Sequence, residues 1–183
     1  INAPIYATPL TRGLMEVKLA RNGMSSRAKL ETVKAGDTRK IGPFTVDFFH
    51  VCHSIPDGVG LGIDCPAGLV VHTGDYKFDH TPVDNWPTDY AKLSEWAGKG
   101  VLALMADSTN ADTPGWTPSE RKIDPAFDQV FREAKGRILV ASFASLISRM
   151  QQVANAAKNH GRKMAFVGHS MRENAKMAIQ LGY

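Results

Sequence analysis

The sequence predicts an α/β protein. Up to residue 110, apolar runs of strand length predominate, with two helical patterns among them. After a polar link at residues 110–118, strand and helix patterns alternate, and that order is typical of a parallel sheet. The 183 residues, 43% of them hydrophobic, suffice for one domain or for parts of two. We therefore expect one domain at residues 1–110 and a second at residues 111–183.

The first part is predicted to contain two helices. Thr8 and Pro9 have the pattern of an N-cap followed by a first helical residue, and Gly23 ends that helix. Apolar residues at helical spacing indicate a second helix at residues 90–97. Strands are predicted at residues 5–7, 30–33, 44–51, 61–64, 69–73 and 101–106, and the last of these is expected to be buried.

The second part is predicted to alternate. A helical turn is expected at residues 119–123, and Asp124 and Pro125 read as the N-cap and first residue of the next helix. That helix is expected to point Phe127, Val130, Phe131 and Ala134 inward. Strands are then predicted at residues 138–142 and 164–167, with helices at residues 145–160 and 170–181.

Several classes of protein are excluded by composition. Two cysteines, Cys52 and Cys65, cannot form a disulfide framework and are expected to be small buried residues in a reducing compartment. No apolar run reaches membrane-spanning length and no signal-peptide pattern is present, so we expect a cytoplasmic protein with no membrane partner. The chain starts with Ile1, and neither end has the composition of a disordered tail, so we expect a segment of a longer protein.

Positive charge is concentrated in one block. Residues 134–172 contain no Asp or Glu and seven basic residues: Lys135, Arg137, Arg149, Lys158, Arg162, Lys163 and Arg172. Because the whole chain carries +4, the residues outside this block sum to −3. Either the block is a solvated helix surface, or it attracts a polyanion toward an acidic site.

His53 and Asp75 lie 22 residues apart, and each follows a predicted strand. Gly74 allows a sharp turn before Asp75, so this carboxylate is expected at the sheet edge, where open α/β sheets gather their chemistry. A neutral imidazole with a carboxylate suits zinc or manganese. Spacing alone leaves open a structural hydrogen-bonded pair, since catalytic zinc usually has three protein ligands.

A strand, small residues and a helix follow one another at residues 138–160. Free N–H groups and the helix dipole at such a junction favour an anion, and Ser145 can equally serve as an ordinary N-cap. Asp107 likewise follows an apolar strand and begins a sequence that is also a plain turn. Trp116 and Phe143 are able to stack on bases, although core packing is the expected use of Phe143.

Longer motifs give a more specific indication. The chain resembles the ribonuclease J family, whose members are metallo-β-lactamase-fold nucleases with an inserted β-CASP domain. The resemblance rests on seven collinear stretches: His53-Ser54-Ile55-Pro56-Asp57, His72-Thr73-Gly74-Asp75-Tyr76-Lys77-Phe78-Asp79-His80-Thr81-Pro82-Val83, Asp107-Ser108-Thr109-Asn110, Gly136-Arg137-Ile138, Phe143-Ala144-Ser145, Gly161-Arg162-Lys163 and Gly168-His169-Ser170-Met171. It implies a partial metallo-β-lactamase αββα sandwich followed by part of a parallel-sheet β-CASP domain.

The resemblance also implies roles for site residues. Asp75 and His53 would be catalytic metal ligands, Asp75 bridging two ions, and Asp107 would support the site. Ser145, Leu146 and Ile147 would contact substrate, although relatives commonly have Asn where this chain has Leu146. Relatives carry a His-x-His-x-Asp-His cluster before the region that matches Ile1 and further histidines after the region that matches Tyr183. We therefore expect this segment alone to be inactive.

The implied function is metal-dependent hydrolysis of RNA phosphodiester bonds, by 5′–3′ exonuclease and endonuclease activity in RNA processing and decay. Two Zn²⁺ are expected in each full-length active site, with Mn²⁺ or Mg²⁺ possible. RNA is the expected partner, and the full-length protein is expected to be a homo-oligomer. Two alternatives stay open: a non-catalytic module that binds RNA or phosphate, and a β-CASP nuclease acting on DNA or mRNA 3′ ends.

Overall fold

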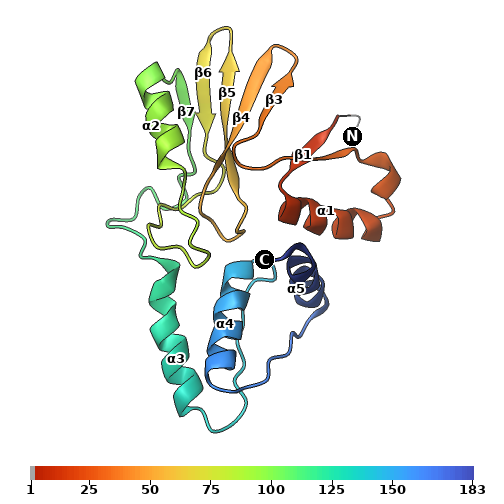
Figure 1. Cartoon of the computed structure of the whole chain (residues 1–183), viewed down its shortest axis with the longest axis vertical. Coiled ribbons are helices and arrows are strands. Elements are labelled where there is room, and N and C mark those ends of the chain that lie inside the picture. Colours follow the sequence, from red (N-terminus) through yellow and green to blue (C-terminus); the bar gives the residue numbers. More distant parts are fainter. Residues whose placement is uncertain (1–2) are drawn as a thin grey trace.

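A five-stranded sheet forms the largest unit of the fold in this computed structural model, which describes residues 3–183. Its strands lie in sequence order and are antiparallel, except that the last two are parallel. They are β3 (Thr38–Ile41), β4 (Phe44–His50), β5 (Val59–Cys65), β6 (Gly68–His72) and β7 (Ala103–Met105). Figure 1 shows this sheet in the upper half of the molecule, with helix α2 (Tyr90–Lys99) beside β6 and β7.

The helix α2 is fixed to the sheet by one large side chain. Trp96 is buried and packs against Phe49, Val51 and Val71, with its ring edge-on to Phe49 at a centroid distance of 5.1 Å. Glycine at position 62 of β5 makes room for this indole, because a Cβ there would overlap the Trp96 ring. The apolar side chains that alternate along β4 and those at helical spacing in α2 therefore pack in one core.

A smaller parallel pair lies beside this sheet. Strands β1 (Ile5–Ala7) and β2 (Leu30–Thr32) are connected through α1 (Pro9–Arg21) and a short 3₁₀ turn, η1 (Ser25–Arg27). As predicted, α1 starts after Thr8 with Pro9 as its first residue, and the chain leaves it through Gly23 at φ +63°. Between this pair and the sheet lies a second core of Val33, Val46 and Phe48, against which Tyr6 also packs.

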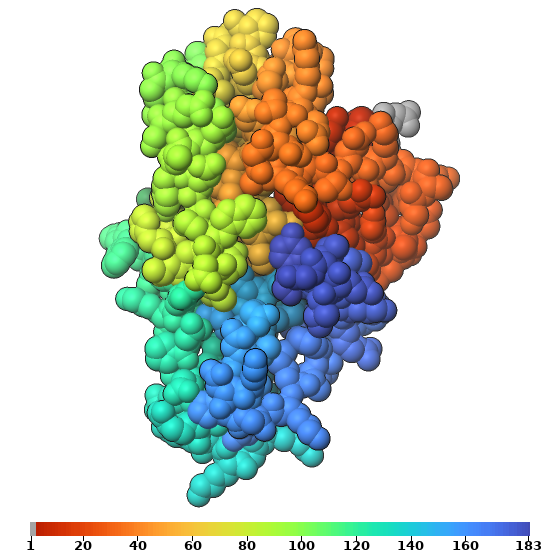
Figure 2. Space-filling model, in the orientation of Figure 1, coloured from red at the N-terminus to blue at the C-terminus, as the bar shows by residue number. Residues whose placement is uncertain are grey.

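Helices make up the regular structure of the second half. A 3₁₀ turn, η2 (Glu120–Ile123), leads into α3 (Asp124–Glu133), followed by α4 (Ile147–Asn159) and α5 (His169–Leu181). These helices lie below the sheet in Figure 1, and Figure 2 shows the C-terminal residues against the N-terminal ones. None of the helices within residues 3–183 has the length and apolar character needed to span a bilayer.

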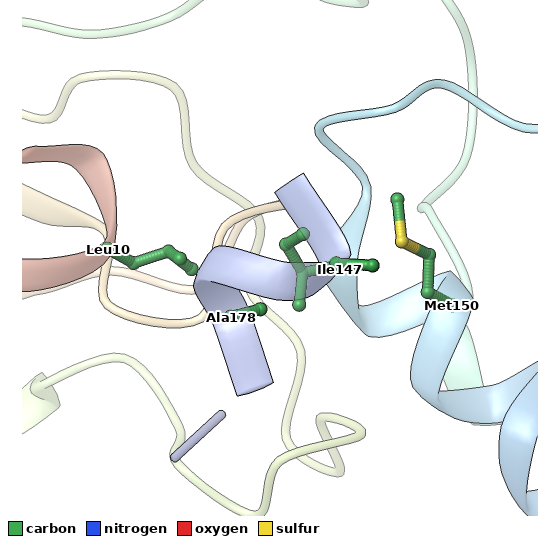
Figure 3. Packing of buried hydrophobic residues seen from close by; sticks show 5 residues of the cluster. Leu10, Ile147, Met150 and Ala178 are labelled. Atoms are coloured by element: carbon green, nitrogen blue, oxygen red, sulfur yellow. The ribbon is translucent and has the colours of Figure 1, made fainter. Parts of the chain in front are cut away.

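One hydrophobic cluster joins the two halves. Leu10 of α1 has no exposed surface and lies in one cluster with Ile147 and Met150 of α4 and with Ala175 and Ala178 of α5. Figure 3 shows Leu10, Ile147, Met150 and Ala178 of this cluster. Ile55, from the loop after β4, also packs against this cluster. Residues on both sides of the predicted boundary at position 110 thus share one core, and the division into two domains stays a prediction.

The α/β class is confirmed, but several predicted elements are wrong. Residues 138–142 and 164–167 form no strand, because neither segment pairs with a neighbouring strand in the described part of the chain. Strand β7 forms, yet its Leu104 is 65% exposed, since β7 is an edge strand that, among residues 3–183, pairs only with β6. Val130 is exposed rather than inward, whereas Phe131 is buried as expected.

Strand β3 was not predicted. It pairs with β4 across the two-residue loop Gly42-Pro43, and Gly42 has φ +58°. A glycine at the first central position is typical of a tight β-hairpin. The strand lacks apolar alternation because most of its side chains are exposed, so periodicity gave no signal for it.

Candidate functional site

Three predicted site residues follow three strands that end at the same edge of the sheet. Strands β4 and β6 both pair antiparallel with β5, and β7 pairs parallel with β6, so β4, β6 and β7 run in the same direction. Their carboxyl ends therefore meet at one edge, where His53, Asp75 and Asp107 follow them. Local patterns place each of these residues after a strand, and the sheet topology is what brings the three strand ends together.

His53 and Asp75 are brought together. The distance from His53 Nε2 to Asp75 Oδ2 is 3.8 Å, and the two side chains are 41% and 78% exposed. Gly74 adopts φ +62°, which turns the chain so that Asp75 leaves the strand direction. The Gly74 amide donates to His72 Nδ1 at 3.0 Å, so His72 stabilises this turn instead of facing the pair.

Asp107 is joined to the same loop by its backbone. Its amide donates to the hydroxyl of Thr73 at 3.1 Å, and this hydroxyl in turn donates to the Gly74 carbonyl. The carboxylate of Asp107 accepts from both the hydroxyl and the amide of Thr109, at 2.6 and 3.0 Å. These two Thr109 hydrogen bonds lower the pKa of Asp107, and nearby His53 lowers it further. Asp107 thus caps its own turn and lies within electrostatic range of His53.

The His53–Asp75 pair has the chemistry of part of a metal shell. An imidazole nitrogen and a carboxylate oxygen are both suitable ligands for zinc or manganese, and both side chains are open to further ligands. No group of three or more potential ligands is found among residues 3–183. The pair therefore fits two positions of a coordination shell and does not complete one.

The predicted anion site at the start of α4 differs from expectation in its donors. Ser145 is exposed, but Ile147 is buried in the cluster of Figure 3. The amide of Leu146 donates to the Phe143 carbonyl at 3.1 Å, and that of Ile147 donates to the Ser145 carbonyl at 3.0 Å. These two amides are consequently not free for an anion, because they close the turn that precedes the helix.

The next turn of α4 carries the free donors. Within the described chain, no hydrogen bond is donated by the amides of Ser148 or Arg149. These two amides at the helix N-terminus and the hydroxyl of the exposed Ser145 just before it are the candidate donors to an anion. Phe143 precedes them and is 82% exposed, so the expectation that it packs in the core is wrong.

The strand-edge residues and the start of α4 belong to adjacent segments. Ile55, two residues after His53, packs against the cluster that contains Ile147. A second link runs through Glu120, whose carboxylate accepts from Lys77 Nζ at 2.8 Å and from Arg149 Nη2 at 2.7 Å. Sequence reasoning missed Glu120, because its only local signal was the expected helical turn at residues 119–123.

The basic block divides into two groups. Arg149 pairs with Glu120, and Arg162 donates to the carbonyls of Ala134 and Gly136. The other five basic side chains are exposed and make no ion pair with residues 3–183: Lys135, Arg137, Lys158, Lys163 and Arg172. Their charge is therefore available to a polyanion.

Comparisons with known proteins relate this chain to ribonuclease J. Residues 135–183 match the family model described as ribonuclease J, beta-CASP domain. The chain is 42% identical over 181 residues to ribonuclease J of Helicobacter pylori strain J99, covering 98% of this chain and 26% of that protein. It is 44% identical over 182 residues to ribonuclease J of Thermus thermophilus, covering 98% and 32%. Against ribonuclease J2 of Bacillus subtilis strain 168, identity is 37% over 183 residues, covering 100% and 33%.

A solved structure supports the fold. A protein of unknown function from Enterococcus faecalis V583 superposes with a TM-score of 0.64 at 16% identity, covering 84% of this chain and 39% of that one. The chain spans about a quarter to a third of the length of the curated relatives it matches. Along nearly its whole length, this chain is therefore similar in sequence to proteins of the ribonuclease J family.

Proposed function

We propose that the protein containing this segment is a metal-dependent ribonuclease that hydrolyses RNA phosphodiester bonds. The observation that carries the proposal is the convergence of His53 and Asp75, 3.8 Å apart, at the edge of the sheet where three strands end. Similarity to the ribonuclease J family and the exposed basic side chains of the second half support an RNA substrate.

His53 and Asp75 would hold the metal. A bound divalent ion, zinc in our proposal, supplies Lewis acidity toward a phosphoryl oxygen and lowers the pKa of bound water. Asp75 offers two carboxylate oxygens and His53 a single imidazole nitrogen, so Asp75 is able to serve more than one ion. Asp107 would keep the Asp75 loop in place through the hydroxyl of Thr73.

The start of α4 would bind a phosphate of the RNA. Its donors are the amides of Ser148 and Arg149 and the hydroxyl of Ser145, and the helix dipole favours the negative charge. The exposed cations Arg137, Lys163 and their neighbours would attract the rest of the polyanion without reading its sequence. Exonuclease activity from the 5′ end together with endonucleolytic cleavage, and homo-oligomeric assembly, remain part of the proposal.

The test is cleavage of 5′-monophosphorylated, end-labelled RNA by the full-length protein, before and after chelation and with zinc or manganese restored. Asp75→Ala is expected to lose more than about 100-fold in kcat, and His53→Ala less, because one residue offers two ligand atoms and the other one. Asp112→Ala is the matched control, since Asp112 is exposed on the link and makes no hydrogen bond within the described chain.

The outcomes separate the alternatives. RNA binding should survive in the Asp75 and His53 variants, because the phosphate contacts lie on α4 and the basic side chains. Binding without cleavage under every metal condition would identify a non-catalytic RNA-binding module instead. Cleavage of single-stranded DNA at a rate equal to that of RNA would favour a DNA-processing nuclease.

A further inference from the structure

Glu120 makes four interactions with two segments that carry the proposed site. Its amide donates to Asp79 Oδ2 at 3.0 Å, and its carbonyl accepts from Gln152 Nε2 at 2.9 Å. Its two carboxylate oxygens accept separately, Oε1 from Lys77 and Oε2 from Arg149. One residue of η2 is therefore bound on one side to the loop after β6 and on the other to α4.

These interactions are partly shielded from solvent. The Lys77 and Arg149 side chains are 16% and 21% exposed, the Glu120 side chain is 38% exposed, and Asp79 and Gln152 are buried. Burial by itself raises the pKa of Glu120, but the hydrogen bonds and charges of Lys77 and Arg149 lower it overall, so the carboxylate is held ionised. Ion pairs with this burial are screened by salt much less than pairs on an open surface.

The partners of Glu120 stand next to the proposed functional groups. Lys77 comes two residues after Asp75, and Asp79 follows in the same loop. Arg149 lies in the first turn of α4, and its own amide is one of the free donors. A connection from Lys77 through Glu120 to Arg149 thus spans from the metal-binding loop to the phosphate-binding helix.

We propose that Glu120 is a positioning residue for RNA cleavage, whose carboxylate holds the Asp75 loop and the start of α4 in a fixed relative placement. The inference rests on the proposed function, because it assigns Glu120 to the alignment of the two ends of that site. Glu120 itself touches neither substrate nor metal in this role. Misplacement of reacting groups by about 1 Å is able to cost about 100-fold in rate.

The role has a characteristic kinetic signature. Neutralising Glu120 releases Lys77 and Arg149 from their ion pairs, so the local positive charge increases and RNA binding is kept or strengthened. Alignment of the bound RNA with the metal-binding loop is lost at the same time. We therefore expect a lower kcat without a higher KM, which loss of a direct RNA contact would not produce.

The experiment compares Glu120→Gln with Glu95→Gln in the full-length protein. Glu95 is the matched control, because it also contacts two lysines, Lys92 at 3.2 Å and Lys99 at 2.5 Å, on the exposed face of α2. For Glu120→Gln we expect a 10- to 100-fold lower kcat per folded, metal-loaded molecule, with KM unchanged within threefold or lower. RNA affinity measured with the metal chelated should equal or exceed that of the wild type.

A second variant keeps the test decisive if Glu120→Gln does not fold. Glu120→Asp retains the charge but is too short to reach Lys77 and Arg149 together, so its kcat should lie between those of the wild type and Glu120→Gln. Melting curves and metal content are recorded for every variant.

Two failures are distinguishable. A wild-type protein that binds RNA but does not cleave it with any metal would overturn the proposed function, and this inference with it. If the wild type cleaves RNA and the kcat of Glu120→Gln is within twofold of that of Glu95→Gln, the positioning role alone is overturned. The same holds if Glu120→Gln is unfolded and the kcat of Glu120→Asp equals that of the wild type. A Glu120→Gln variant with raised KM and weakened RNA binding would overturn it as well.

Discussion

The hydroxyl of Tyr183 donates a 2.9 Å hydrogen bond to Oδ2 of Asp57, 126 residues earlier in the chain. The same oxygen accepts from the amide of Leu10 at 2.9 Å, near the start of α1. Asp57 is buried, and within the described residues its other oxygen has no hydrogen-bond partner. Because the Thr8 side chain does not cap α1, Asp57 supplies this negative charge to the helix N-terminus from a distant loop.

Tyr183→Phe is expected to lower the free energy of unfolding by about 1–3 kcal/mol, the range for a hydrogen bond to a charged, buried acceptor. The variant leaves the Asp57 carboxylate with one donor fewer while keeping the aromatic ring. Urea unfolding at pH 7 measures the difference. Tyr6→Phe is the control, since the Tyr6 hydroxyl makes no hydrogen bond within the described residues, and it should change stability by less than about 0.5 kcal/mol.

The hydrogen bond between Tyr183 and Asp57 also predicts that the free energy of unfolding decreases at high pH. Burial first, and then the charge and hydrogen bond of Asp57, raise the pKa of Tyr183 above its ordinary value of 10.0. A raised pKa favours the protonated form in the folded state, so this contribution to stability is complete below pH 10 and declines as pH rises further. Between pH 9 and pH 11, wild-type stability should fall more steeply than that of Tyr183→Phe. Parallel curves for the two proteins would contradict the hydrogen bond.

Gly62→Ala should destabilise the protein by about 1–3 kcal/mol or more, the usual cost of overpacking, because the new methyl group would overlap the buried Trp96 ring. Gly98→Ala in α2 is the opposite case. A Cβ at position 98 would meet no atom of the described residues within 4 Å, and alanine favours the helix by about 0.5–1 kcal/mol over glycine. Thermal melts of the two variants should therefore shift in opposite directions, and a shift in the same direction would argue against the packing of α2 on β5.

The hydrogen bonds of Asp79 predict that the free energy of unfolding decreases at low pH. Although burial raises its pKa, hydrogen bonds from the amides of Glu120 and Thr81 lower it below the ordinary value of 3.8. A lowered pKa favours the charged form in the folded state, so its contribution is complete above about pH 4 and is lost as pH falls through the folded value. Between pH 5 and pH 2, Asp79→Asn should lose less stability than the wild type. Asp112→Asn, at an exposed position, should follow the wild-type curve.

Ser145 tests the phosphate site on α4. Asp and Asn have nearly the same shape, so Ser145→Asp and Ser145→Asn differ mainly in charge. Beside a bound phosphate, the carboxylate should weaken RNA binding by about tenfold, whereas the amide should stay within about twofold of wild type. The measurement is RNA affinity of the full-length protein with metal chelated, and added salt should reduce the difference in affinity between the two variants. Equal affinities would mean that this turn only begins the helix.

Local sequence determined the elements whose signals lie within a few residues. Thr8, Pro9 and Gly23 marked both ends of α1, and apolar alternation placed β4 and β6, with His53 and Asp75 following their ends. These features depend on steric preferences and side-chain periodicity, which act between near neighbours. The pairing of β4 and β6 with β5 then fixed the 3.8 Å approach of His53 to Asp75.

Tertiary structure alone decided which segments find partners. Residues 138–142 have strand-like composition but form no strand, because strand pairing needs the backbone of another segment alongside. Glu120 acquires its partners from positions 43, 41 and 29 residues away in Lys77, Asp79 and Arg149, and nothing in its own neighbourhood encodes them. Hydrogen bonds and ion pairs act over only a few ångströms. Interactions between residues this far apart in the sequence therefore form only once the chain has brought β6, η2 and α4 together.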